Sequence, residues 1–358
     1  MPTRRAFFTS LAAASVCSGS TWAGIGNPVA LSAAMAQDGS YMLVGLRDDG
    51  SVLFSIPLEG RGHAAAAHPF AAEAVAIARR PGNFAKVIDC STGLVTQVLR
   101  TPRGYHFYGH GAYSTNGTFL FTTENEIETG QGRIGVWTRS GGYRRVGEFS
   151  SGGIGPHEII RLPSGDLAIA NGGIRTHPDT GREKLNLSEM RPNLSILSTE
   201  GRLLDQVEPP AAEHQNSLRH IAAMPDGRVV CGFQWQGDPY EAPGLVAIYQ
   251  SESQLKATEI HDASHFQLDG YIGSVCVFDQ GRRIAASAPR AGRAYIYDEA
   301  GKLSGHHKRR DVCGLAPGPS GQLLATDGDG HVQLYGDTHR IGLKAHPIAF
   351  DNHLVAIS

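Results

Sequence analysis

The chain has 358 residues, of which 41% are hydrophobic and 18% charged, and its formal net charge at pH 7 is −2. A near-neutral charge without a basic stripe argues against a nucleic-acid-binding face. No apolar run is long enough to cross a bilayer, so we expect no membrane span in the mature protein. The 45 glycines, with no helical period after the N-terminus, favour many short strands joined by tight turns.

The N-terminus resembles a twin-arginine export signal. Arg4 and Arg5 precede a short apolar stretch, "LAAASVCSGSTWA", although phenylalanine and threonine replace the usual leucine and lysine after the arginines. Small residues favour cleavage after Ala23. We therefore expect residues 1–23 to be a signal peptide and residues 24–358 to form a single domain in the periplasm.

A histidine recurs at a nearly fixed distance before a turn. The repeating unit reads as a small apolar strand, a turn such as "MPDGR" and a second strand such as "RVVCGF". Five of seven units carry the histidine seven residues, or in one unit eight, before the turn: His63, His110, His157, His220 and His346. Ser274 and Gly314 hold the same position in the other two units. Such a repeat predicts a solenoid or a propeller.

The units begin near residues 63, 110, 157, 220, 274 and 313, and each reads as four short strands. The stretch 29–58 reads as an incomplete unit, and the C-terminal stretch 346–358 reads as its missing strand. A blade shared by the two termini would remove the exposed edge that an open array leaves. The sequence therefore predicts an all-β, seven-bladed β-propeller of the WD or YVTN type, with six or eight blades as alternatives.

In a propeller, the loops between the second and third strands lie on the face where the histidines begin the inner strands. These loops are the long and polar ones here, and binding sites gather on such loops. We expect the loop over residues 171–193 to be a lid or docking surface, because so long an irregular segment is uncommon in a compact domain. The binding candidates on this face are Arg79, Arg80, Asn171, Lys184, Gln215, Arg219, Gln234 and Asp238.

Imidazoles gathered at one channel mouth could ligate a transition metal, with carboxylates completing the shell. The metal or ligand candidates are His63, His110, His157, His220, Glu124, Glu158, His106 and His177. The structural alternative is the Gly-His pair of WD repeats, whose imidazole only forms a hydrogen bond within its own blade. The run from Glu213 to His220 could bind an anion or a carboxylate as easily as a metal.

Four cysteines of the expected mature chain, Cys90, Cys231, Cys276 and Cys313, fall in or beside predicted strands. We expect them to be buried thiols, with one disulfide as the alternative. The sequence contains no Gly-x-Ser-x-Gly elbow, which leaves nucleophilic catalysis without support.

Several segments resemble a family of exported bacterial propellers known as a domain of unknown function. They include "RGHAAAAHP", "HFYGHGAYS", "TENEIETGQGRIGVW", "GIGPHE", "ANGGIRTHPDTGREKLNL", "HQNSLRH" and "FQWQGDP". Genes of that family commonly accompany those of imelysin-like and dihaem oxidoreductase-like proteins in iron-linked clusters. The resemblance implies a periplasmic role in iron or other metal handling, with imelysin-like or haem-containing proteins as partners.

Two classes of function follow. The favoured hypothesis is a non-enzymatic protein whose histidine-rich face holds iron or copper or docks a metal-carrying partner. The alternatives are a lyase or hydrolase that uses the same histidines as general bases, or a plain protein-interaction scaffold.

Overall fold

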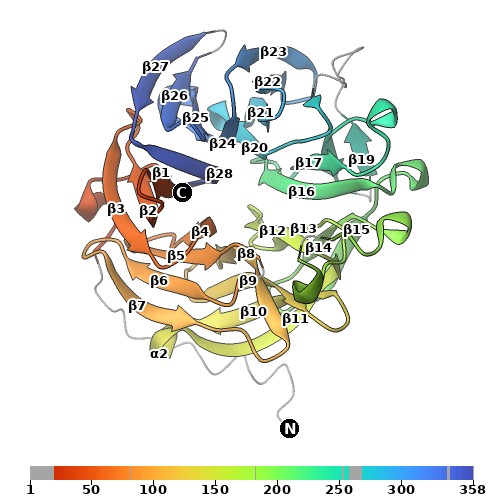
Figure 1. Ribbon diagram of the computed structural model, residues 1–358, viewed down its shortest axis with the longest axis horizontal. Coiled ribbons are helices and arrows are strands. Elements are labelled where there is room, and N and C mark those ends of the chain that lie inside the picture. Colours follow the sequence, from red (N-terminus) through yellow and green to blue (C-terminus); the bar gives the residue numbers. More distant parts are fainter. Residues whose placement is uncertain are drawn as a thin grey trace.

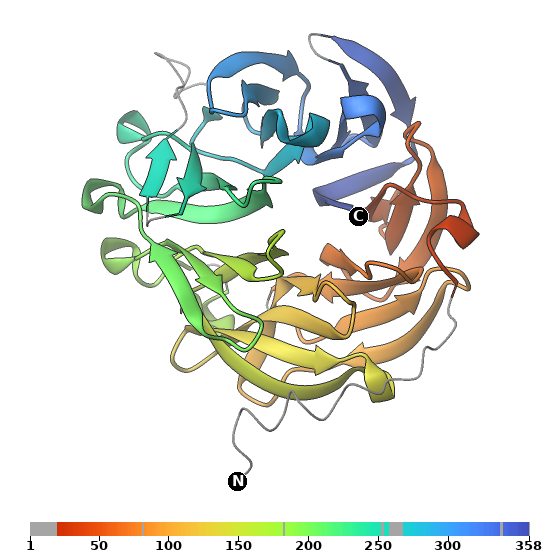
Figure 2. The same cartoon turned by 180° about the vertical axis from the view of Figure 1, so that it is seen from behind.

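A computed structural model describes residues 20–80, 82–181, 183–251, 254–257, 268–336 and 339–357. Within these ranges, 28 strands form seven four-stranded antiparallel sheets. The sheets stand like blades around a central channel (Figures 1 and 2). The predicted seven-bladed propeller is confirmed. The proposed signal residues Arg4 and Arg5 lie outside the described residues.

Each blade is built from consecutive strands, except for the blade shared by the termini. Blade 1 contains β28 (Ile348–Ala356), β1 (Ala30–Ala36), β2 (Tyr41–Leu46) and β3 (Val52–Leu58). Blade 2 contains β4 (Gly62–Ala67), β5 (Glu73–Ala78), β6 (Ala85–Asp89) and β7 (Leu94–Leu99). Blade 3 contains β8 (Tyr105–Tyr113), β9 (Phe119–Glu126), β10 (Gln131–Thr138) and β11 (Arg144–Ile154). Blade 4 contains β12 (Pro156–Arg161), β13 (Leu167–Asn171), β14 (Asn193–Leu197) and β15 (Leu203–Val207).

The remaining blades repeat this order. Blade 5 contains β16 (Asn216–Ala223), β17 (Val229–Trp235), β18 (Val246–Gln250) and β19 (Gln254–Ala257). Blade 6 contains β20 (Ser274–Phe278), β21 (Arg283–Ala288), β22 (Arg293–Asp298) and β23 (Leu303–Lys308). Blade 7 contains β24 (Val312–Pro317), β25 (Leu323–Asp327), β26 (His331–Tyr335) and β27 (Arg340–Ala345).

The helices are single turns in the connections between strands. They are η1 (Ala23–Ile25), α2 (Ser140–Tyr143), η2 (Pro178–Thr180), η3 (Leu187–Glu189), η4 (Ala211–Glu213), η5 (Pro239–Glu241), η8 (Asp279–Gly281) and η9 (Pro319–Gly321). Two of them, η2 and η3, lie in the long connection between β13 and β14. No helix of the described residues combines the length and apolar character needed to cross a membrane.

The ring is closed by the two ends of the chain, as the sequence predicts. The C-terminal strand β28 pairs antiparallel with β1 and forms the innermost strand of blade 1. The Ser32 hydroxyl donates a hydrogen bond of 2.9 Å to the carbonyl of His353, 321 residues away in sequence. β28 is the edge strand of this sheet beside the channel, and its pairing with β1 joins the C-terminal strand to the first strand of the propeller (Figure 1).

Apolar side chains fill the space between neighbouring blades. Val75 and Ile77 of blade 2 pack with Leu120 and Trp137 of blade 3. The inner strands crowd together around the axis, where large side chains would collide. Small residues such as those of "GHAAAA" in β4 therefore suit these strands.

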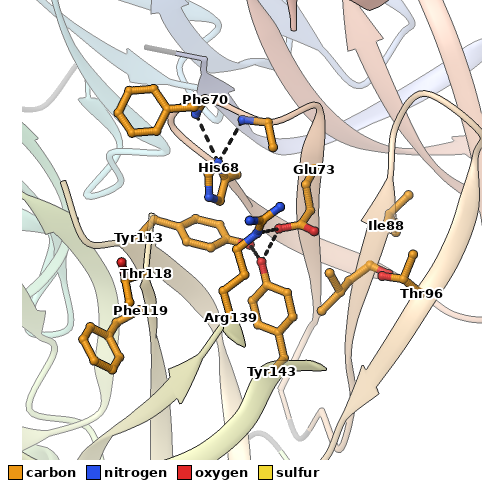
Figure 3. Close-up of polar contacts among 12 residues, drawn as sticks. His68, Phe70, Glu73, Ile88, Thr96, Tyr113, Thr118, Phe119, Arg139 and Tyr143 are labelled. Atoms are coloured by element: carbon orange, nitrogen blue, oxygen red, sulfur yellow. Dashed lines mark hydrogen bonds and ion pairs between the residues drawn. The ribbon is translucent and has the colours of Figure 1, made fainter. Parts of the chain in front are cut away.

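A buried polar network also joins blades 2 and 3 (Figure 3). The Tyr143 hydroxyl donates a hydrogen bond to the Glu73 carboxylate, and the Tyr113 and Tyr143 hydroxyls lie 2.6 Å apart. The Arg139 guanidinium donates to the same carboxylate over 2.9 Å. These contacts tie the loop after β10 to the start of β5, so the two blades are held by polar as well as apolar contacts.

The chain before β1 packs on the propeller. The Trp22 side chain is 5% exposed, and its indole donates a hydrogen bond of 2.7 Å to the carbonyl of His68. The Ala72 amide donates to the carbonyl of Ser20. Cleavage after Ala23 stays a prediction, and it would remove this buried indole.

Cys90, Cys231, Cys276 and Cys313 are free and buried. Burial raises the pKa of the Cys90 thiol to about 12, and the pKa values of the other three thiols are raised by the same cause. Thiols of this kind behave as small apolar side chains. The expectation of buried thiols is confirmed.

Candidate metal centre

β-bulges turn the inner strands at the positions of the channel histidines. Among the described residues, the inner strands of six blades shift register against their neighbours: β4, β8, β12, β16, β24 and β28. Bulges bend a strand and aim a side chain in a new direction. His63, His110, His157 and His353 lie inside these bulges. His220 directly follows the bulge of β16. The regular inner strand β20 carries Ser274 instead.

Five imidazoles meet in the channel. They belong to His63, His110, His157, His220 and His353. The ring centre of His353 lies 4.4 Å from that of His110 and 4.5 Å from that of His63. Ring centres of His157 and His220 are 5.1 Å apart. In the group of His63, His110 and His353, one ring nitrogen from each residue lies within 4.8 Å of the others.

These imidazoles are buried but incompletely hydrogen-bonded. His63, His110, His220 and His353 are at most 6% exposed, and His157 is more exposed as a whole although its Nδ1 is buried. One buried nitrogen of each ring has no hydrogen-bond partner among the described residues. Buried polar atoms are normally paired. The orphaned atom is Nε2 in His110 and His353 and Nδ1 in the other three rings, and such a gathering of unpartnered nitrogens indicates a missing ligand.

Carboxylates stand behind three of the rings. Asp351 Oδ1 lies 3.7 Å from Nδ1 of His63. The two oxygens of Glu158 lie 3.8 Å from Nδ1 of His110 and 3.5 Å from Nδ1 of His220. In His110 the carboxylate stands beside Nδ1 and leaves the unpartnered Nε2 for a ligand, which is the usual arrangement around metal-binding histidines. In His63 and His220 the unpartnered nitrogen is the Nδ1 that faces the carboxylate, at more than hydrogen-bond distance.

Four of the five imidazoles are uncharged around neutral pH. Burial lowers the pKa of His63 below 6.5, and it lowers those of His110, His157 and His353 well below 6.5. Neighbouring imidazoles and arginines add to the effect, because a second positive charge in the cluster is unfavourable. Neutral imidazoles keep the lone pairs that metal coordination requires.

Asp351 is ionised in spite of its burial. Burial opposes its ionisation, but its contacts with His63, the Asn352 amide and Arg61 hold the pKa of Asp351 at about 2. Arg61 Nε donates to this carboxylate over 2.7 Å. The carboxylate therefore remains a stable partner for a positively charged centre.

The cluster separates two cavities of about 350 Å³ each. The alanine-rich chamber is lined by strand residues such as Ala65, Ala112 and Ala222, and both His110 and Glu158 reach it. The cationic chamber lies on the other side, where the long loops gather. Its lining includes five basic residues and four of the cluster histidines: Arg79, Arg80, Lys184, Arg219, Arg290, His63, His157, His220 and His353.

A family profile described as "Protein of unknown function (DUF1513)" matches residues 56–357. The chain belongs to this DUF1513 family. Membership agrees with the resemblance to a family of unknown function, while export and the imelysin association stay expectations. A search of curated proteins finds no significant match.

One solved structure shares the fold of this DUF1513 protein at low identity, and a second matches it more weakly. Hydrazine synthase from Kuenenia stuttgartiensis has a TM-score of 0.62 and 14% sequence identity, covering 82% of this chain and 91% of that chain. A protein of unknown function from Bacteroides caccae has a TM-score of 0.47 and 13% identity, covering 78% of this chain and 94% of that one. At these identities the comparison supports the fold alone.

The structure brings together five of the predicted metal candidates: His63, His110, His157, His220 and Glu158. The fifth histidine of the cluster is His353, so the prediction for His346 is wrong. His346 lies before β28, with Nε2 3.0 Å from the carbonyl of Gly50. The fixed distance between a histidine and the next turn does not identify His353, because the closing strand has no following turn within its own blade.

Glu124 is not part of the site, contrary to the prediction. It lies on β9 rather than in a loop, and its side chain is fully buried within blade 3. Arg145 Nη2 lies 2.5 Å from its carboxylate, and the Thr122 hydroxyl donates to it over 2.9 Å. The pairing with Arg145 satisfies this carboxylate inside the blade.

His106 and His177 are also outside the cluster. Nδ1 of His106 lies 2.8 Å from the carbonyl of Phe107, and its ring stacks on Tyr108. Nδ1 of His177 accepts a hydrogen bond from the Asp179 amide and caps η2. Local backbone contacts therefore account for both imidazoles.

Five of the eight predicted binding residues line the cationic chamber: Arg79, Arg80, Lys184, Arg219 and Gln234. Asn171 is instead buried at the end of β13, where its amide donates to the carbonyl of Ser151. Gln215 donates to the Leu187 carbonyl, and Asp238 caps η5, so neither lines the chamber.

Sequence reasoning missed several residues of the two chambers. They are His353, Tyr108, Tyr271 and Arg290, and the reasoning also missed Asp351, which lies behind His63. The sequence does contain a signal for Arg290 as a binding residue, because this residue stands in the connection between the second and third strands of its blade. The expected binding face contains all such connections.

Proposed function

We propose that this protein is an exported, periplasmic metal-binding propeller that holds a transition metal ion, iron or copper, at the histidine cluster in its channel. The observation that carries the proposal is the convergence of five imidazoles, each with an unpartnered buried nitrogen, and burial keeps four of these imidazoles neutral. Imelysin-like or haem-containing periplasmic proteins are the proposed partners in metal handling.

The spacing of the donor atoms supports a metal site. Imidazole nitrogens bind such ions at about 2.0 to 2.1 Å, so two nitrogens on one ion are at most about 4.2 Å apart. The donors of His63, His110 and His353 lie within 4.8 Å of one another. Small ring rotations close this difference. His157 and His220 are near enough to complete the shell after similar rotations.

The donor set restricts the class of metal. Imidazole with nearby carboxylate suits iron, copper and zinc and disfavours calcium and magnesium, which prefer oxygen ligands. The two carboxylates Glu158 and Asp351 would balance the charge of a divalent ion.

The same observations make general-base catalysis a weaker explanation. A general base works best when its pKa lies near the working pH. Burial places the pKa values of His110, His157 and His353 well below 6.5, so these imidazoles accept protons poorly near neutrality. Their lone pairs remain available to a metal.

The test is elemental analysis of protein purified from its native periplasm by inductively coupled plasma mass spectrometry. We expect about one transition metal ion per chain in the wild type and loss of the ion in the double variant H110Q/H353Q. The control is H306A, which removes an exposed histidine on the outer strand β23. Metal-free wild-type protein would favour the enzyme or scaffold hypotheses, and full occupancy in the double variant would reject the assigned ligands.

Export is tested separately by cell fractionation. The variant R4K/R5K should accumulate in the cytoplasm while the wild type reaches the periplasm, because the paired arginines are the signal's distinguishing feature. Equal distribution of the two proteins would contradict the proposed route.

A further inference from the structure

The cationic chamber gathers five basic side chains in one cavity. Arg79, Arg80, Lys184, Arg219 and Arg290 line it together with tyrosine, tryptophan, glutamine and asparagine side chains. None of its described lining residues is an aspartate or glutamate. Like charges brought together in a partly enclosed space repel one another unless an anion joins them.

Arg219 provides the strongest evidence that the chamber binds an anion. It is the extra residue of the β16 bulge and is only 6% exposed. Its Nε has no hydrogen-bond partner among the described residues. A buried guanidinium without an anionic partner is costly, so its retention points to a ligand.

Two of the other cations, Arg80 and Lys184, are held in place by neutral groups. Arg80 Nη1 donates hydrogen bonds of 3.0 Å to the hydroxyls of Tyr108 and Thr176. Lys184 Nζ donates to the side-chain carbonyl of Gln236 over 2.6 Å. These partners orient the cations but leave their charge available.

Aromatic rings complete the arrangement. The Arg290 guanidinium lies 4.4 Å from the ring centre of Tyr271, and that of Arg80 lies 5.3 Å from the ring centre of Tyr108. Arginines stacked on rings lose less mobility when they bind an oxyanion. The chamber is therefore preorganised for several oxygen atoms of one ligand.

We propose that the cationic chamber is the binding site for a small multivalent oxyanion, one that carries two or more carboxylate or phosphate groups. Guanidinium groups match both classes of oxygen, and multiple cations favour multiple charges. A cavity of about 350 Å³ suits a small molecule rather than a macromolecular segment. The proposal stands without the metal, although four cluster histidines also face this chamber.

The experiment is isothermal titration calorimetry on metal-stripped protein. The chelator must be dialysed away, because it is itself a polycarboxylate. Citrate and pyrophosphate are the probes for the two oxygen chemistries, and acetate is the monovalent control. We expect saturable binding of citrate or pyrophosphate, with acetate weaker by tenfold or more, and the stronger of the two probes identifies the class.

The variant R219Q should weaken binding by roughly tenfold to a hundredfold, as expected for loss of a charge-assisted contact. The control R282Q removes an exposed arginine that pairs with Asp279 outside the chamber and should change the affinity less than twofold. K184Q offers a second chamber variant should R219Q fold poorly.

R219M separates a binding role from a structural one. Without ligand, its melting temperature should be equal to or higher than that of the wild type, because an unpaired buried charge is replaced by an apolar side chain. It should lose the rise in melting temperature that the anion gives the wild type. Absence of binding by both probes at millimolar concentration, or wild-type affinity in both R219Q and K184Q, would overturn the proposal. Neither result would bear on the metal analysis, which uses different variants.

Discussion

Acidification should destabilise the propeller through its channel histidines. Burial keeps His63, His110, His157 and His353 neutral in the folded state, with pKa values below 6.5. In the unfolded chain, the same side chains titrate near about 6.5. Below that pH the unfolded state binds more protons than the folded state, so the free energy of unfolding falls as the pH falls.

The size of the effect follows from the number of residues. Between pH 7.5 and 5.5, a histidine that charges only on unfolding lowers the free energy of unfolding by about 1 kcal/mol. Four such residues together lower it by about 4 to 5 kcal/mol. Small domains are stable by about 5 to 15 kcal/mol, so the cluster should set the acid limit of this protein. The stability is fully present above pH 7.5 and is lost as the pH falls through the histidine range.

Urea unfolding of metal-stripped protein at pH 7.5, 6.5 and 5.5 measures this dependence. The double variant H110Q/H353Q should lose about 2 kcal/mol less than the wild type between the two end values, because two of the four groups are gone. Burial also lowers the pKa of His306, so the variant H306A should lose part of the wild-type dependence, but less than the double variant loses. A free energy of unfolding that is constant over this range, or an equal fall in the double variant, would refute the assignment of neutral buried imidazoles.

Three further outcomes test other parts of the structure. Gly109 has a φ of +109° and an added Cβ would lie 2.5 Å from an atom of the neighbouring imidazole, so G109A should lower urea stability by about 1 to 3 kcal/mol and reduce metal content. Y143F removes a donor to the Glu73 carboxylate and should cost about 1 to 3 kcal/mol in the same assay with unchanged metal content. A chain that begins at Gly24 lacks Trp22 and should be about 3 to 5 kcal/mol less stable than one that keeps it; equal stability would show that the buried indole is dispensable.

The repeat in the sequence predicts the architecture well, because each blade carries its own strand and turn pattern. It also identifies four of the five cluster histidines. It fails at His353, whose strand has no following turn to count from, and assigns His346 instead. It fails at Glu124 because the buried partner Arg145 comes from the outer strand of the same blade, a contact that no local pattern reveals.

The cationic chamber shows a different limit. The sequence places Arg79, Arg80, Lys184 and Arg219 on one face, yet it cannot show that their side chains share one cavity without a carboxylate. That property depends on which blades are neighbours and on how a bulge turns Arg219 inward. Asp351 was missed for a related reason, because its role comes from the strand that closes the ring.

The closing strand also has a consequence for assembly of the site. His353 and Asp351 reach the channel only when β28 docks beside β1, and β28 is synthesised after the other described strands of the propeller. Pairing across the whole length of a chain is a slow, non-local step. The cluster therefore cannot exist in a partly made or open ring. A metal ion bound by His353 and by histidines of earlier blades would link β28 to those blades. Such a link would slow the opening of the propeller.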